Sequence, residues 1–194
     1  MDVLLYRIVR PIIRFLMIIL YRPKYVGLDN IPKDGGIVLA GNHTNILDCW
    51  LLMSSTKRTI HFLGKDSLSK GIKGLIFKNM GLIFVNRNIH DKEALNSAKE
   101  VLKDNKVIGI FPEATINRGN DLTLPFKIGS VKMAYDTNSY LIPFVITGKY
   151  KIFNNKLKIE FLKPYKVKKD LTEENNKLRN IIEKRLEAGN GNFK

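Results

Sequence analysis

The residues best suited to acid–base chemistry are His43 and Asp48, which lie five positions apart within residues 42–48 (NHTNILD). A neutral imidazole can take a proton from an attacking hydroxyl, and a carboxylate bonded to its other nitrogen fixes the tautomer and stabilises the imidazolium. The pair therefore predicts general-base catalysis. Because histidines also serve structural roles, the spacing alone leaves a purely structural pair as the alternative.

Neither a protein nucleophile nor a metal site accompanies the pair in the sequence. The chain has no Gly-x-Ser-x-Gly elbow, and the charge of Asp48 disfavours the thiolate of adjacent Cys49. His43, His61 and His90 share no metal-ligand spacing. We therefore expect direct attack by a substrate hydroxyl, with no metal ion and no cofactor.

Helical geometry restricts how His43 and Asp48 can meet. Residues five apart in a continuous α-helix point about 140° away from each other, because each residue turns the helix by about 100°. The pair must therefore straddle a bend, with a strand ending near Asn42 and a helix beginning near Thr44 or Asn45, both good N-cap residues. This places the site at the carboxyl end of a strand, where open α/β sheets bind ligands.

Apolar runs and helical patterns alternate along the chain. Strands are expected at residues 35–41, 59–63, 82–85, 107–111, 141–147 and 156–161, and helices at residues 46–54, 67–80, 92–104, 128–137 and 171–186. This alternation predicts an α/β fold, a single domain whose mixed sheet is covered by helices on both faces. We expect that domain to occupy residues 23–188, followed by a frayed tail in residues 189–194.

Residues 1–22 are expected to form an amphipathic helix at a membrane interface. Pro11 should kink or restart this helix, leaving its second part too short to span a bilayer. Three basic residues share one helix face, where we expect anionic lipid to attract them: Arg7, Arg10 and Arg14. The alternatives are a cleavable signal peptide, although residues 21–24 (YRPK) stand where a small-residue cleavage site belongs, and a helix packed on the domain with its arginines in solvent.

The strongly basic composition favours anionic partners. The chain carries 33 Lys and Arg against 18 Asp and Glu, a net charge of +15, although its richness in Lys, Asn and Ile also fits biased genome composition. A nucleic-acid binder is the non-enzymatic alternative, but no recognition fold or stacking aromatic pattern accompanies the charge. We expect an anionic membrane surface as a partner and no nucleic acid.

Four blocks follow one another along the chain: residues 42–48 (NHTNILD), 81–87 (GLIFVNR), 111–115 (FPEAT) and 142–145 (IPFV). Together they resemble those of the 1-acylglycerol-3-phosphate acyltransferases, in the phospholipid/glycerol acyltransferase superfamily. The family's blocks read Asn-His-x-Ser-x-x-Asp, Gly-x-Ile-Phe-x-x-Arg, Phe-Pro-Glu-Gly-Thr-Arg-Ser and a proline-centred apolar strand. The resemblance spans residues 24–165 and makes His43 the general base for a hydroxyl attacking an acyl thioester, with Asp48 orienting it.

The resemblance also implies the substrates and the residues that bind them. The acyl donor is acyl-CoA or an acyl carrier protein thioester, and the acceptor is a lysophospholipid, by default 1-acylglycerol-3-phosphate. Acceptor phosphate binding falls on Arg87, which closes the second block, and on the third block with Glu113 and Thr115. Lys65 and residues 126–129 (FKIG) also resemble family elements. The implied location is the cytoplasmic face of the cell membrane, as a peripheral or monotopic protein.

The third block departs from the family pattern. Ile116 stands where the family has arginine, and Ala114 lacks the freedom for positive φ that the family's glycine has. Arg118 is the candidate to replace the missing charge. A changed phosphate clamp leaves other lysolipids, or other hydroxyl or amine acceptors, as alternatives, and a thioesterase that uses water is the alternative reaction. From the residues alone, Glu113 either contacts substrate or braces its loop.

Residues 67–80 predict a basic amphipathic helix between the first two blocks. Its lysines lie away from an apolar face made of Leu68, Ile72, Leu75 and Ile76. This face either packs on the core or meets the membrane where a lipid acceptor enters.

Overall fold

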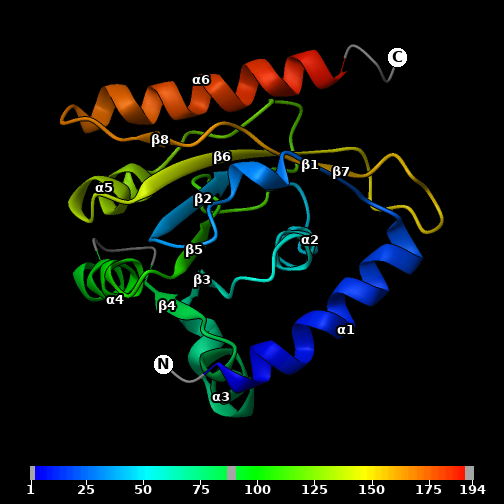
Figure 1. Cartoon of the computed structure of the whole chain (residues 1–194), viewed down its shortest axis with the longest axis horizontal. Helices are drawn as coiled ribbons and strands as arrows, with labels where there is room; N and C mark the ends of the chain where they lie inside the picture. Colours follow the sequence, from blue (N-terminus) through cyan, green and yellow to red (C-terminus); the bar gives the residue numbers. More distant parts are fainter. Residues whose placement is uncertain (1–2, 87–90, 191–194) are drawn as a thin grey trace.

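The computed structural model describes residues 3–86 and 91–190, whose centre is an eight-stranded sheet (Figure 1). The strand order is β1-β7-β6-β2-β5-β3-β4, and β8 pairs with β6. The strands are β1 Lys24–Val26, β2 Ile37–Gly41, β3 Ile60–Lys65, β4 Ile83–Val85, β5 Val107–Ile110, β6 Tyr140–Thr147, β7 Lys158–Phe161 and β8 Tyr165–Lys166.

The middle of the sheet is parallel. In register, Leu39 of β2 lies opposite Gly109 of β5 and Ile142 of β6, and β3 and β4 continue the parallel order beyond β5. Strands β7 and β8 run antiparallel to β6, which makes the sheet mixed. Because the parallel strands share a direction, the loops that follow β2, β3, β4, β5 and β6 all leave from the same edge of the sheet.

Six helices accompany the sheet in the described part of the chain. They are α1 Leu4–Tyr21, α2 Asp48–Ser55, α3 Gly71–Asn79, α4 Lys92–Lys103, α5 Gly129–Asp136 and α6 Leu171–Asn190, with short 3₁₀ turns η1 Leu28–Asn30 and η2 Asp66–Ser69. The single helix expected over residues 67–80 is divided into η2 and α3. The division falls at Lys70, which is extended, and at Gly71, whose φ is +65°.

Alternate side chains along the strands point to opposite faces of the sheet and belong to two separate hydrophobic cores. In β2, Ile37 and Leu39 pack with α1 and α2, whereas Val38 and Ala40 pack with α4, α5 and α6. Figure 1 shows α6, α5 and α4 along one face of the sheet and α1 and α2 along the other. Both faces are therefore covered, as the nearly unbroken apolar runs of the parallel strands predict.

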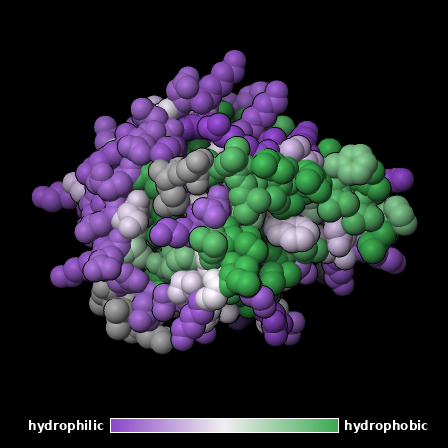
Figure 2. All heavy atoms as spheres, turned by 90° about the horizontal axis from the view of Figure 1, so that it is seen from below, coloured by the Kyte–Doolittle hydropathy of each residue, from purple (hydrophilic) through white to green (hydrophobic). Residues whose placement is uncertain are grey.

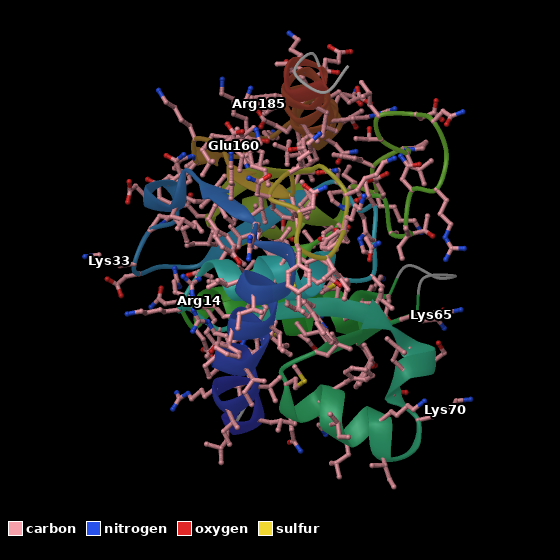
Figure 3. The ribbon with its side chains drawn as sticks, turned by 90° about the vertical axis from the view of Figure 1, so that its right-hand side faces the viewer. Arg14, Lys33, Lys65, Lys70, Glu160 and Arg185 are labelled. Carbon is pink, nitrogen blue, oxygen red and sulfur yellow. The ribbon has the colours of Figure 1, made fainter. Side chains whose placement is uncertain are left out.

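Helix α1 turns part of its arginine face toward the protein, whereas the sequence predicts that this face meets lipid. It runs through Pro11 without restarting. Two of its arginines face the protein: Arg10 donates from Nε to the carbonyl of Thr56, and Arg14 (Figure 3) donates to the carbonyl of Ser54. These carbonyls lie at the end of α2, where main-chain acceptors lack helical partners and positive charge is favoured. The prediction that the arginine face meets lipid is therefore wrong for Arg10 and Arg14.

The opposite side of α1 is apolar and exposed. Ile12 and Phe15 are 55% and 62% exposed, whereas Tyr6, Ile13 and Met17 are buried in the core that α2 and the sheet share. No helix in the described residues is long and apolar enough to cross a bilayer.

Helix α6 is tied to the sheet by an ion pair. Arg185 donates from Nε and Nη2 to the two carboxylate oxygens of Glu160 in β7, both at 2.8 Å (Figure 3). The helix extends to Asn190, beyond the expected end at Leu186, and residues 191–194 of the expected tail lie outside the described residues.

Candidate active site

His43 and Asp48 meet across the connection between β2 and α2. Nδ1 of His43 lies 2.9 Å from Oδ2 of Asp48. The helix begins at Asp48 itself, so the expected N-caps at Thr44 and Asn45 are wrong. The reason is that their main-chain N–H groups turn back to Oδ2 of Asp48, at 2.7 and 2.8 Å. The aspartate thus folds the connection around itself and holds the imidazole within reach.

The hydrogen bonds of Asp48 fix the tautomer of His43. Asp48 is fully buried, and its Oδ2 accepts two main-chain N–H groups in addition to its contact with the imidazole. An oxygen that accepts these bonds is an acceptor for the ring as well, so Nδ1 of His43 carries the proton. The lone pair of the imidazole is then on Nε2, as a general base requires.

The ring of Phe111 and the main chain of Asn117 hold His43 in place. The imidazole ring stacks on Phe111 with a centroid distance of 4.1 Å and an interplanar angle of 16°. The main-chain N–H of Asn117 donates to the carbonyl of His43 at 2.7 Å. The side chain of His43 keeps 14% of its surface exposed, whereas the side chain of Asp48 is fully buried.

Glu113 braces the loop after β5. One carboxylate oxygen accepts the main-chain N–H of His43 at 2.8 Å, and the other accepts that of Leu124 at 2.7 Å. Burial raises the pKa of this carboxyl group, and the two N–H donors oppose that rise. Of the two roles that the sequence allows for Glu113, these contacts favour loop bracing.

Ala114 occupies a conformation that favours glycine. Its φ is +57°, so the turn keeps the left-handed backbone although the residue carries a Cβ. Ala114→Gly should therefore raise the free energy of unfolding by about 0.5–1 kcal/mol, measured by urea denaturation. Ala134→Gly, inside helix α5, is the matched control and should lower it by about 1 kcal/mol or more. A destabilised Ala114→Gly variant would contradict the assignment of strain.

The predicted phosphate-binding residues are distributed along the same edge of the sheet. Lys65 ends β3 and points outward (Figure 3), and Thr115 and Arg118 are exposed in the loop after β5. Within residues 3–86 and 91–190, no hydrogen bond or ion pair joins these three side chains to His43 or Asp48. Arg87 lies outside the described residues.

Two residues near the pair were not predicted from the sequence as functional. The hydroxyl of Tyr150, after β6, donates to Oδ1 of Asp48 at 2.6 Å. The side-chain amide of Asn42 bonds the carbonyl and the N–H of Ile146 at 3.0 and 2.8 Å, which joins the ends of β2 and β6. Asn42 opens the first block, so its position was a signal; Tyr150 lies 102 residues from Asp48 and has no local signal.

The described residues contain no group of three or more His, Cys, Asp or Glu side chains that could together hold a metal ion. The groups that the site itself offers for chemistry are the imidazole of His43 and its buried carboxylate partner, at the open edge of the sheet.

The chain matches a known protein family and is similar to several curated proteins. Residues 22–147, which include all four blocks, match the family described as Acyltransferase. The 1-acyl-sn-glycerol-3-phosphate acyltransferase of Borreliella burgdorferi is 36% identical over 123 residues, which are 62% of this chain and 49% of the relative. The protein of the same name from Helicobacter pylori is 30% identical, over 68% of this chain and 57% of its own length. This chain thus spans about half the length of the curated relatives it matches.

A solved structure shares the fold. The crystal structure of the 1-acyl-sn-glycerophosphate (LPA) acyltransferase PlsC from Thermotoga maritima matches with a TM-score of 0.75 and 21% identity, over 94% of this chain and 80% of that chain. The likeness confirms the predicted single α/β domain with a mixed sheet.

Proposed function

Because this chain belongs to the acyltransferase family, we propose that it moves a fatty acyl group from a thioester to the hydroxyl of a lysophospholipid. The observation that carries the proposal is the His43–Asp48 pair, with Nδ1 bonded to a buried carboxylate and Nε2 left with the lone pair at the carboxyl edge of the sheet. The default acceptor is 1-acylglycerol-3-phosphate, for which the relatives are named, and the product is then phosphatidic acid.

In the proposed reaction His43 acts as the general base. Its Nε2 takes the proton of the acceptor hydroxyl while the oxygen attacks the thioester carbonyl. The carbon–sulfur bond then breaks, the thiolate leaves, and the imidazolium returns the proton to sulfur. Asp48 accepts the Nδ1–H bond throughout, which keeps the ring oriented and stabilises its charged form.

We assign the acceptor phosphate to the edge of the sheet from which the loops after the parallel strands leave. Lys65 ends β3, and Arg118 and Thr115 lie in the loop after β5, which leaves the same edge. The sequence adds Arg87, which lies outside the described residues. Arginine and lysine pair readily with phosphate oxygens. The donor carrier is acyl-CoA or acyl carrier protein, both anionic, and the net charge of +15 suits either.

We assign membrane contact to an apolar face made by two helices. Figure 2 looks onto the side of the molecule where α1 and α3 lie and shows hydrophobic side chains gathered there. Exposed apolar area of this kind binds lipid through burial, without requiring anionic headgroups. We propose a peripheral or monotopic location, on the cytoplasmic face of the cell membrane. The face consists of Leu4, Ile8, Ile12, Phe15 and Ile19 of α1 and Ile72, Leu75 and Ile76 of α3, each at least 43% exposed.

A thiol-release assay tests the proposed reaction. The purified chain, given acyl-CoA or acyl carrier protein thioester in mixed micelles, should release thiol only when a lysolipid is present. A panel of lysolipid acceptors, scored by product mass, identifies the head group. Equal release without any acceptor would identify a thioesterase, and release with another hydroxyl or an amine would correct the acceptor.

Vesicle binding tests the apolar face. The double substitution of Ile12→Glu and Phe15→Glu should lower the partition coefficient onto neutral phosphatidylcholine vesicles by about 100-fold, because each side chain loses a large part of its burial energy in lipid. Sedimentation of vesicles with bound protein gives the measurement.

The control is Tyr135→Glu, which places one glutamate on an exposed aromatic residue of α5 and so adds half of the charge that the double substitution adds. It should bind vesicles like the unmodified chain. Binding that requires anionic lipid and disappears in high salt would reject the apolar face in favour of an electrostatic surface.

A further inference from the structure

The loop between β6 and β7 reaches the buried side of the catalytic pair. Its Tyr150 donates a hydrogen bond from its hydroxyl to Oδ1 of Asp48, at 2.6 Å. The other carboxylate oxygen, Oδ2, is occupied by His43 and by the main-chain N–H groups of Thr44 and Asn45. Tyr150 thus binds the carboxylate oxygen that the imidazole and these main-chain groups leave open.

The environment of Tyr150 makes its hydroxyl a permanent donor. Burial, and then the negative charge of Asp48, raise the pKa of the phenol well above its ordinary value. A phenol that keeps its proton at every working pH holds the carboxylate in one orientation. Hydrogen bonds to a charged acceptor in a buried site are among the stronger ones, so the contact constrains Asp48 more than a surface bond would.

The loop that carries Tyr150 is fastened to the end of α1. The ring of Tyr150 meets the ring of Tyr21 edge to face, with centroids 5.6 Å apart and planes at 81°. The main-chain N–H of Phe153 donates to the carbonyl of Leu20 at 2.6 Å, and the guanidinium of Arg22 lies 5.9 Å from the centre of the Phe153 ring. Figure 1 shows the two segments side by side. The last turn of α1 therefore fixes where Tyr150 can lie.

We propose that Tyr150 is a positioning residue for the reaction: it fixes the carboxylate of Asp48, and through it the imidazole of His43, while Tyr21 at the end of α1 holds Tyr150 in place. The inference rests on the proposed acyl transfer. It makes the seating of α1 part of the geometry of the active site, because the chain of contacts runs from Tyr21 through Tyr150 and Asp48 to His43.

Steady-state kinetics of Tyr150→Phe test the proposal. The substitution removes only the hydroxyl, so kcat should fall about tenfold with KM nearly unchanged, since the lost bond acts on the base and not on substrate binding. The matched control is Tyr25→Phe, which removes a phenolic hydrogen bond of 2.7 Å to Ser54 on the same helix α2 and should keep kcat. Equal losses in both variants, or a change in KM alone, would overturn the positioning role.

A double-mutant cycle separates positioning from general loss of structure. In an Asp48→Asn background the amide nitrogen faces Tyr150, so the hydroxyl no longer donates to a charged acceptor, and Tyr150→Phe should cost kcat at most about twofold. An undiminished tenfold cost in that background contradicts the proposal. Tyr21→Leu, which removes the edge-to-face contact, should lower kcat about threefold alone and add little to Tyr150→Phe. Full additivity of the two would remove Tyr21 from the chain of contacts.

One readout does not depend on acyl transfer. The Nδ1–H proton of His43, assigned by its loss in His43→Gln, should change its NMR chemical shift in Tyr150→Phe and keep it in Tyr25→Phe. An unchanged resonance in Tyr150→Phe would refute the positioning role even if the chain transfers acyl groups. A shifted resonance in a chain that shows no acyl transfer would instead count against the proposed function alone.

Discussion

Replacing His43 with alanine is expected to lower kcat for acyl transfer by about 10²–10⁴-fold, the contribution usual for a positioned general base. The reason is that Nε2 of His43 is the lone-pair nitrogen of a ring held by Asp48 at 2.9 Å and by Phe111 at 4.1 Å. The measurement is acceptor-dependent thiol release, with the ester product quantified by mass. The KM for the acceptor should change little, because the ring acts on the proton.

The controls for His43→Ala separate chemistry from folding. Thr44→Ala alters the neighbouring, exposed side chain while keeping the main-chain N–H that Asp48 accepts, and it should retain activity. Added imidazole should partly restore His43→Ala, since the substitution leaves a space beside Phe111 and Asp48 that imidazole can occupy. A His43→Ala rate within about threefold of the unmodified chain would reject general-base catalysis at this residue.

The sheet could be predicted from the sequence because its central strands, β2, β3, β5 and β6, are buried on both faces. Strands β2 to β7 coincide with apolar runs that the core requires. The two strands that were not predicted, β1 and β8, are three and two residues long and partly exposed. Their pairing is set by neighbours such as Ile159 of β7, opposite Tyr25 of β1, and a run this short leaves no periodic signal.

The orientation of α1 shows where periodicity fails. Most positions around this helix are apolar, and its charged residues are all arginines. Charged residues usually lie on the side of a helix that faces solvent. At about 100° per residue, however, Arg10 and Arg14 lie beside the buried Tyr6 and Met17. The acceptors that draw them inward are carbonyls of Ser54 and Thr56, which no local pattern could reveal.

The site was predictable only as far as its local part. His43 and Asp48 share one short segment, so helix geometry alone is enough to require a bend between them. Glu113 reaches His43 across 70 residues and Tyr150 reaches Asp48 across 102, and such contacts depend on the strand order. The order β6-β2-β5 places the loops that carry them on either side of the loop after β2. The roles of Arg87, Lys65, Thr115 and Arg118 stay predictions.

The second large effect is expected at Asp48, and its size should depend on the substitution. Asp48→Asn is nearly isosteric, and its amide oxygen should take the place of Oδ2, where the N–H groups of Thr44 and Asn45 need an acceptor. The amide nitrogen then faces Tyr150, whose hydroxyl oxygen can accept. His43 keeps its tautomer and loses only the charge opposite it. We therefore expect kcat to fall by about 10–10²-fold.

Asp48→Ala removes the acceptor altogether, and its effect should be larger. The Nδ1–H of His43 loses its partner, and the N–H groups of Thr44 and Asn45 and the hydroxyl of Tyr150 are left unpaired. Each buried donor left unpaired costs about 1–3 kcal/mol of stability, so the midpoint temperature of thermal unfolding should fall. Because nothing then fixes the tautomer and orientation of the His43 ring, kcat of Asp48→Ala should approach that of His43→Ala. Equal kcat values for Asp48→Asn and Asp48→Ala would mean that the charge of Asp48, and not its hold on the ring, is what the reaction uses.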